Sequence, residues 1–142
     1  MAYQECGGLL GDDGCCSVCV RPQLFLDRDA VTDVKAGGVL MLPPFYYKDV
    51  SEDGLFAAYA EVIERVGDAR LRVLLYHIPQ MSALPIPFGL IERLRARYPQ
   101  TVVGIKDSAG KLENMTAMVE RFPGFAVLSG ADPLMLPLLK AG

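Results

Sequence analysis

A lysine at the end of the most strand-like stretch of the sequence is the first candidate for covalent chemistry. From Thr101 to Ser108, the chain passes from β-branched residues to polar, turn-forming ones directly at Lys106. An apolar surround at the end of a buried strand disfavours the charged form of such an amine. An uncharged lysine attacks a ketone and forms a Schiff base. The alternative is a lysine that closes the strand and reaches into water.

Tyrosines lie at or just after the ends of two other apolar runs. Tyr76-His77 ends a second apolar run, and Tyr46-Tyr47 follows a third. A phenol can move protons to and from a carbonyl oxygen while an amine makes the covalent bond. No serine-histidine-acid set and no paired carboxylates occur at these run ends. Catalysis by Lys106 together with Tyr76 is therefore favoured, although each tyrosine could instead plug the mouth of a barrel.

Cysteines offer a weaker chemical signal. Cys6, Cys15, Cys16 and Cys19 all lie early, and the Cys16-x-x-Cys19 spacing is compatible with half of a zinc site or a redox pair. A closed zinc site needs four ligands, and the single histidine is far along the chain. Incidental thiols are the favoured interpretation, and no metal is expected.

The composition is that of an ordinary soluble globular domain. The 142 residues are 51% hydrophobic and carry a net charge of −3, which does not favour binding to nucleic acid or to an anionic membrane surface. No apolar run approaches the roughly 20 residues that a membrane helix needs. The N-terminus lacks the layout of a secretory signal. A cytoplasmic protein is expected.

Strands and helices alternate from residue 37 onward. Strands are expected at residues 38–42, 72–76, 102–106 and 125–128, the first of them buried on both faces. Helices are expected from a Ser51 cap to Gly67, with Leu55, Tyr59, Val62, Ile63 and Val66 inward; from near Pro87, with Ile91, Leu94 and Tyr98 inward; through Leu112, Met115, Met118, Val119 and Phe122; and from an Asp132-Pro133 start to Leu139. Residues 1–36 have no sustained period, and only 24–26 and 29–35 are possible short elements.

This alternation predicts βα units and an α/β fold with a parallel sheet. Such a sheet is either doubly wound or part of a (β/α)8 barrel, and the absence of a glycine-rich phosphate turn weakens the nucleotide-binding form of the first. A whole barrel takes about 250 residues, so about four units make a partial (β/α)8 TIM barrel. We expect a poorly defined segment at 1–36 and a partial barrel domain at 37–142. Functional groups of such folds gather at the carboxyl ends of the strands.

Three linked motifs carry a resemblance to a known family. Tyr76-His77-Ile78-Pro79, followed by Gly104-Ile105-Lys106-Asp107-Ser108, resembles the signature pair of dihydrodipicolinate synthases and N-acetylneuraminate lyases. The segment from Leu42 to Lys48 is similar to the family's proline-tyrosine-tyrosine segment, and Leu128-Ser129-Gly130 is similar to its seventh strand. The resemblance covers residues 37–142 without gaps. That family consists of pyruvate-dependent class I aldolases on a (β/α)8 barrel, commonly tetrameric.

The resemblance implies a role for each matching residue. Lys106 would form the Schiff base with pyruvate or another 2-oxo acid, and Tyr76 would be the general acid/base. Tyr47 would act in a proton relay across a subunit interface of a homo-oligomer, and Ser129 and Gly130 would bind substrate. The partners implied are pyruvate and an aldehyde, with no cofactor.

The sequence also departs from the family. No counterpart of the Gly-Thr-Thr-Gly-Glu-type segment, which holds the 2-oxo acid carboxylate, occurs in residues 1–36. Met81 replaces the arginine that dihydrodipicolinate synthases place after the tyrosine-proline motif, which argues against aspartate semialdehyde as the second substrate and leaves sugar-acid or hydroxy-oxo-acid aldolases open. The first three strands and the eighth are missing from the match, so a truncated, inactive fragment that acts as an assembly or binding piece is the alternative. Because such a partial barrel exposes sheet edges, we expect the chain alone to be unstable or to aggregate unless it assembles with copies of itself.

Overall fold

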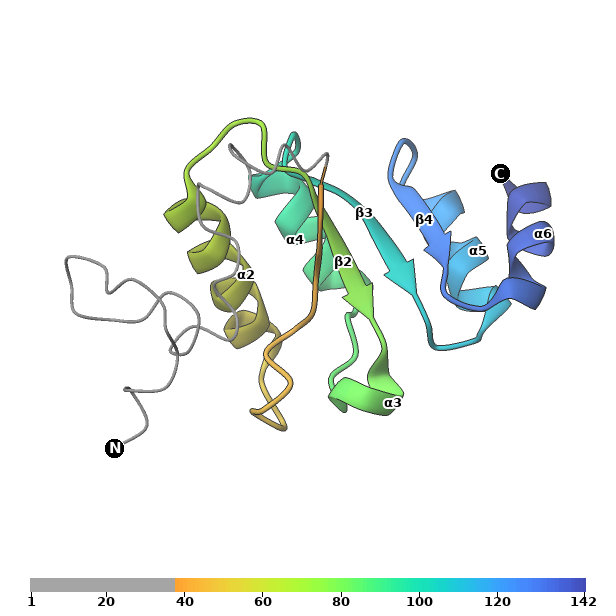
Figure 1. The fold of residues 1–142 in the computed structure, drawn as a ribbon, viewed down its shortest axis with the longest axis horizontal. Helices are drawn as coiled ribbons and strands as arrows, with labels where there is room; N and C mark the ends of the chain where they lie inside the picture. Colours follow the sequence, from red (N-terminus) through yellow and green to blue (C-terminus); the bar gives the residue numbers. More distant parts are fainter. Residues whose placement is uncertain (1–37) are drawn as a thin grey trace, which may run out of the picture.

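The computed structural model describes residues 38–142. The expectations for residues 1–36, including the four cysteines, lie outside the described residues. Strands and helices alternate along the described chain (Figure 1). The elements are β1 (Val39–Met41), α2 (Glu52–Val66), β2 (Val73–His77), α3 (Pro79–Ser82), α4 (Phe88–Arg97), β3 (Val102–Asp107), α5 (Leu112–Arg121), β4 (Ala126–Ser129) and α6 (Asp132–Ala141). Within this range no helix is both long and apolar enough to cross a membrane.

The strands form one four-stranded parallel sheet in the order β1-β2-β3-β4. The arrowheads of β2, β3 and β4 point to the same, lower edge in Figure 1. Because neighbours in the sheet are also neighbours in the sequence, the connections that contain α2, α4 and α5 serve as crossovers between adjacent parallel strands. The predicted α/β architecture of successive βα units is confirmed.

Helix α2 shows how the sequence sets an element's bounds. Ser51 lies just before the helix, and its hydroxyl accepts a hydrogen bond from the backbone N–H of Gly54. Gly67 ends the helix in the left-handed conformation, with φ of 58°, where the absence of a side chain removes the steric penalty. The five side chains predicted to face inward are all buried. The start of this helix, its buried face and its end were therefore all predictable from the sequence.

The core lies between one face of the sheet and the helices. Val73 and Leu75 of β2 and Ile105 of β3 are fully buried there, against Leu90, Ile91 and Leu94 of α4 and Met115 and Met118 of α5. Side chains alternate across a strand, so Leu74 and Tyr76 point to the opposite face, which the described helices do not cover. The sheet thus has a packed face and an open face.

That open face corrects the prediction for β1. The strand was expected to be buried on both faces, but Leu40 is 45% exposed. Leu40 pairs with Leu74 in the register, so it shares the open face, where no layer of described residues covers it.

Three smaller expectations were wrong. Asp132 does not cap α6, since it is the first helical residue and Ala131 precedes it without a side-chain cap. Tyr98 is only half-buried, because its hydroxyl reaches out to donate to Glu64 at 2.6 Å. The proline-rich loop after β2 contains a short helix, α3, that no period had indicated.

Candidate active site

Lys106 and Tyr76 meet on the open face of the sheet, at the carboxyl ends of β2 and β3. The two residues are partners in the parallel register, so their side chains project from the same face. The Nζ atom of Lys106 donates a hydrogen bond to the Tyr76 hydroxyl at 3.3 Å and lies 4.5 Å from the ring centroid. Both side chains are half-buried, rather than enclosed. The geometry places a primary amine and a phenol where both can reach a single carbonyl group.

The Tyr76 phenol is tuned by its neighbours. Hydrogen bonds from the Ser108 hydroxyl, first, and from the Lys106 amine lower the pKa of Tyr76. Both bonds stabilise the phenolate more than the phenol, which makes the proton easier to remove. A proton held less tightly suits a group that must both give and take it near neutral pH.

Backbone hydrogen bonds to the end of β2 and to the segment after β4 hold the turn at Ser108 in place. Its backbone N–H donates to the carbonyl of His77 at 2.8 Å, and Gly130 donates to the carbonyl of Asp107 at 2.7 Å. A Cβ added at Gly130 would lie 1.9 Å from the Ser108 Oγ atom. Only glycine therefore fits at position 130 with Ser108 in this position.

His77 and Asp107 point to the opposite, packed face, one residue beyond Tyr76 and Lys106. The carboxylate of Asp107 is fully buried and accepts from the N–H of Ala109 and from the Asn114 amide, both at 2.7 Å. The Nδ1 atom of His77 accepts from the N–H of Ile86 at 3.2 Å, and burial lowers the pKa of this imidazole. The bond to Asn114 ties the end of β3 to α5, and the bond from Ile86 ties the end of β2 to the segment before α4.

The predicted site residues of the other strands lie nearby in different roles. Gly130 provides the close contact to Ser108. The Ser129 hydroxyl donates to the carbonyl of Ala131 at 2.8 Å and accepts from its N–H at 3.1 Å, so it closes the turn before α6. Their binding of substrate stays a prediction.

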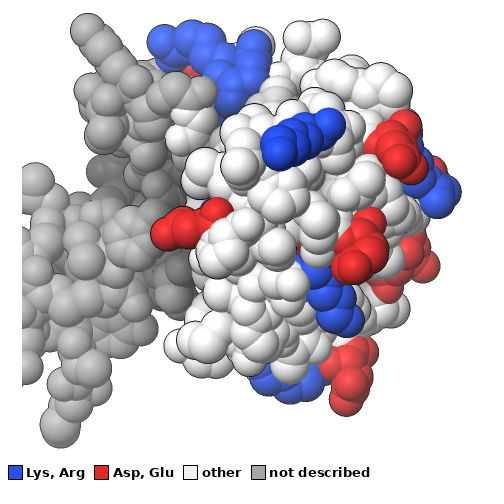
Figure 2. All heavy atoms as spheres, turned by 90° about the vertical axis from the view of Figure 1, so that its right-hand side faces the viewer, with Lys and Arg blue, Asp and Glu red and all other residues white. Residues whose placement is uncertain are grey.

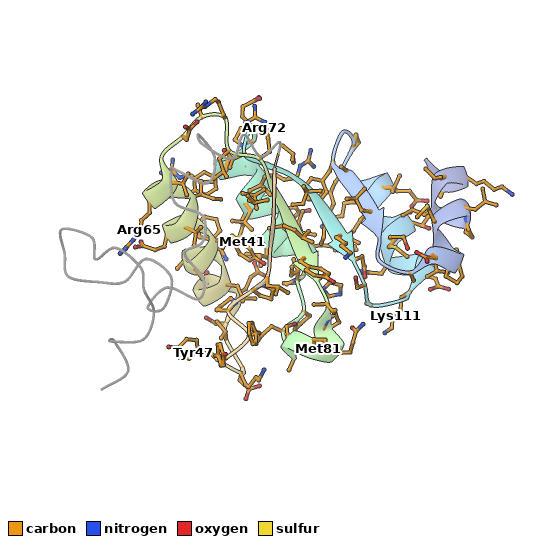
Figure 3. All side chains as sticks on the ribbon, viewed as in Figure 1. Met41, Tyr47, Arg65, Arg72, Met81 and Lys111 are labelled. Atoms are coloured by element: carbon orange, nitrogen blue, oxygen red, sulfur yellow. The ribbon has the colours of Figure 1, made fainter. Side chains whose placement is uncertain are left out.

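Tyr47 is not brought to the amine by the described chain. It lies in the loop after β1, at the edge to which the strands point (Figure 3). Its backbone N–H donates to the carbonyl of Pro44 at 3.2 Å, but its side chain is 71% exposed and its phenol forms no hydrogen bond or ring contact with the described residues. Its neighbour Tyr46 stacks on Phe45 with ring centroids 4.5 Å apart. The role of Tyr47 across a subunit interface stays a prediction.

A cavity of about 210 Å³ opens beside Tyr76. The loop after β1, the end of β2 and helix α3 form its walls, through Leu42, Phe45, Tyr76, Ile78, Met81 and Ser82. Figure 3 shows Met81 on the same side of the molecule as Tyr47. Within residues 38–142, no three side chains of the metal-binding types gather in one place.

Sequence reasoning missed Ser108, Asn114 and the cavity. The sequence indicates only a turn at Ser108. Its effect on the pKa of Tyr76, which lies 32 positions earlier, depends on a contact that only the fold creates. Asn114 follows Asp107 by seven positions and crosses from α5 to the strand end. A buried aspartate directly after a candidate lysine was the one available signal, since such a carboxylate needs donors nearby.

Comparison with known proteins is consistent across sequence and structure. A sequence model of the Dihydrodipicolinate synthetase family matches residues 29–142. An "Uncharacterized DapA-like lyase" of Chloroflexus aurantiacus is 30% identical over 142 residues, which are all of this chain and 46% of that protein. The 4-hydroxy-tetrahydrodipicolinate synthase of Listeria monocytogenes is 40% identical over 105 residues, 73% of this chain and 34% of that one.

Solved structures give the same picture. The crystal structure of dihydrodipicolinate synthase from Agrobacterium tumefaciens superposes with a TM-score of 0.75 and 31% identity, over 82% of this chain and 40% of that chain. YagE, a prophage protein of E. coli K12 solved in complex with pyruvate, superposes with a TM-score of 0.68 and 26% identity, over 78% of this chain and 37% of that chain. The predicted partial (β/α)8 barrel is confirmed. The chain spans less than half the length of each of these four proteins.

Proposed function

Because this chain belongs to the dihydrodipicolinate synthetase family, we propose that it is a Schiff-base-forming lyase, a class I aldolase that adds pyruvate to an aldehyde or cleaves it from the product. The observation that carries the proposal is the 3.3 Å contact between the Lys106 amine and the Tyr76 hydroxyl. It lies at the carboxyl edge of a parallel sheet, where barrel enzymes keep their active sites.

The chemistry follows from these two groups. The Lys106 amine adds to the ketone carbon of pyruvate, and loss of water leaves an imine. The Tyr76 phenol protonates the departing hydroxyl, and the resulting phenolate takes a proton from the methyl group of the protonated imine, which gives an enamine. The enamine carbon bonds to the aldehyde carbon while the aldehyde oxygen takes a proton from the Tyr76 phenol. Hydrolysis of the imine then releases product and the free amine. Cleavage runs the same steps in reverse.

Other residues complete the proposal. Tyr47 would relay protons from a partner copy in a homo-oligomer, a role that its 71% exposure leaves open to a partner. Ser129 and Gly130 would bind the 2-oxo acid at the next strand end. The active segment would be 37–142, and a cytoplasmic location belongs to the same proposal.

Borohydride trapping tests the proposal directly. Incubation with pyruvate and borohydride reduces the imine to a stable secondary amine, so the peptide that contains Lys106 should gain the mass of one reduced pyruvate unit. Lys106→Met should abolish this label. Lys111→Met, five residues further along and exposed, is the matched control and should retain it. A folded, unlabelled wild type, or a label that survives in Lys106→Met, would refute the proposal.

A second function has one observation in its favour. Leu136 and Leu139 of α6 are 61% and 71% exposed, as a piece that assembles with other protein would require. An inactive assembly or binding piece predicts no trapping and elution as an oligomer from a sizing column. Labelling of Lys106 would exclude it.

A further inference from the structure

We infer that the 210 Å³ cavity beside Tyr76 receives the side chain of the aldehyde, and that this side chain is apolar, such as a phenyl or a branched alkyl group. The inference rests on the proposed aldolase function and adds the class of the second substrate. It depends on three features of the cavity: its lining, its charge and its position.

The lining offers almost no polar group to a ligand. Leu42 and Phe45 come from the loop after β1, and Ile78 and Met81 come from the segment that contains α3. Ser82 is the only aliphatic hydroxyl in the lining, and it is buried and occupied. Its Oγ atom donates to the carbonyl of Leu84 at 3.0 Å and accepts from the N–H of Leu84 at 3.2 Å. A charged or hydroxylated substituent would give up its bound water there without new partners, at a cost in affinity.

No charged side chain is among the residues that line the cavity. The ammonium of Lys48 lies against the wall, but it donates to the backbone carbonyls of two lining residues, Phe45 and, at 3.0 Å, Ser82. Lys48 itself is not among the residues that line the cavity. A carboxylate on the aldehyde would meet hydrocarbon, whereas an apolar group would gain by leaving water.

The position of the cavity connects it to the reacting atoms. Tyr76 contributes to its lining, and the Lys106 Nζ atom lies 4.5 Å from the centroid of that ring. An aldehyde whose carbonyl oxygen contacts the phenol can therefore extend its substituent into the cavity. The volume suffices, since an apolar protein cavity of about 150 Å³ takes up benzene.

Met81 controls entry to this cavity. It lines the cavity and is also 73% exposed, so it lies at the mouth, on α3 (Figure 3). Its flexible thioether side chain adapts to apolar groups of different shape. A cation at this position would instead favour an aldehyde that carries a carboxylate.

The test compares acceptor aldehydes with pyruvate as the common donor. We expect kcat/KM for benzaldehyde to exceed that for succinic semialdehyde, which carries a carboxylate, by at least tenfold. Met81→Arg should reduce this ratio at least tenfold, whereas Met81→Leu should keep it because the lining stays apolar. Preference of the wild type for succinic semialdehyde, or an unchanged ratio in Met81→Arg, would overturn the inference. If the wild type does prefer succinic semialdehyde, loss of this preference in Lys48→Met would show that Lys48 binds the carboxylate.

The same samples separate this inference from the proposed function. Trapping of pyruvate on Lys106 without a preference for benzaldehyde overturns the inference alone. If no trapping occurs, the proposed function fails, and binding of benzyl alcohol to the unreacted protein tests the cavity by itself. We expect the Met81 methyl resonance to shift with increasing benzyl alcohol until the shift saturates. Succinate in place of benzyl alcohol should cause no shift. No shift with benzyl alcohol would overturn the cavity as an apolar site.

Discussion

Two hydroxyl groups and one amine meet at Tyr76, and their balance sets how the phenol can act. The Ser108 hydroxyl and the Lys106 amine both donate to the phenol oxygen, so both favour its deprotonated form. A third residue, Gly130, secures this arrangement by leaving room for Ser108. At the residue scale, the site thus consists of Tyr76, Ser108 and Lys106, and the glycine at position 130 leaves the space that Ser108 needs.

Removal of the Ser108 hydroxyl should shift the titration of Tyr76. The pKa of Tyr76 is lowered by hydrogen bonds from Ser108, first, and from Lys106, so Ser108→Ala should raise that pKa toward the ordinary tyrosine value. The alkaline limb of the pH–rate profile should move up with it. Tyrosinate absorbance followed against pH, with Tyr76→Phe subtracted, isolates this one phenol.

Ser108→Thr is the control for that titration, because it retains a hydroxyl and should leave the pKa of Tyr76 lowered. An identical titration curve for Ser108→Ala and the wild type would show that Ser108 does not act on the phenol. The result does not depend on turnover, so it can be obtained whether or not an aldehyde substrate is known.

The approach of Lys106 to Tyr76 was predictable from the sequence, whereas the residues that support the two side chains were not. The carboxyl ends of neighbouring parallel strands must lie at one edge, so Tyr76 and Lys106 could be expected to approach each other from the order of elements alone. Ser108 and Gly130 meet across 22 positions through loop conformations, for which the sequence has no period. His77 and Asp107 were placed at the same edge correctly, but the pleat turns both to the packed face.

At the scale of elements, the turns after β3 and β4 press against each other. A Cβ on Gly130 would overlap the Oγ and approach the Cβ of Ser108, at 1.9 and 2.8 Å. Gly130→Ala should therefore lower the free energy of unfolding by about 1–3 kcal/mol, the usual cost of forcing extra atoms into a packed site. Urea unfolding measures this loss.

Gly89→Ala is the matched control for that substitution. The atoms nearest to a Cβ there would be those of the Glu52 carboxylate, at 3.1 Å, at the end of a side chain that can swing away. Because alanine is favoured over glycine within a helix, Gly89→Ala should be neutral or stabilising. Adding Ser108→Gly to Gly130→Ala should recover part of the loss. Equal stability of both alanine variants would show that the two turns do not interlock.

Helix α2 buries one side-chain hydroxyl group in the core, that of Tyr59. Tyr59 is fully buried, its oxygen has no hydrogen-bond partner among the described residues, and burial raises its pKa. An unsatisfied buried polar group costs about 1–3 kcal/mol. Tyr59→Phe should thus raise the free energy of unfolding by about 1 kcal/mol, as measured by urea unfolding. Tyr59→Leu, which removes ring volume as well, should lower it, and a loss in Tyr59→Phe would mean that the hydroxyl is bonded.

The elements themselves were largely predictable, because each depends on local signals. Apolar runs closed by Pro43 or Tyr76 marked strands to within a residue, and Ser51 with Gly67 marked a whole helix. The two misses have different causes. Helix α3 is a single turn, too short for a helical period, and Leu40 is exposed because nothing described covers the open face.

On the scale of the whole molecule, exposed apolar side chains gather beside β4 and α6. A hollow of about 630 Å³ lies between α5, β4 and α6, and Met135 and Leu139 contribute to its lining. Figure 2 shows this side, where charged groups are scattered over a mainly uncharged surface. Leu128, Met135, Leu136 and Leu139 are each 48% exposed or more. Apolar surface of this kind promotes association.

We therefore expect concentration-dependent self-association of this chain, detectable by sedimentation velocity. The pair Leu136→Ser and Leu139→Ser should reduce the fraction of oligomer, since it removes apolar surface without adding charge. Glu113→Ser, an exposed polar change on α5, is the control and should not reduce it. A monomer at all concentrations, or equal association of the Leu→Ser variant, would contradict the expectation.

The side-chain alternation of β3 has one more consequence. Lys106 faces the open side of the sheet and Asp107, its immediate neighbour, faces the helices. Deletion of one residue upstream in this strand would shift the register by one position and turn each later side chain to the opposite face. The amine would then enter the apolar core opposite Leu75 and the carboxylate of Asp107 would lie opposite Tyr76, so the loss of a single codon would exchange an amine for an acid at this edge.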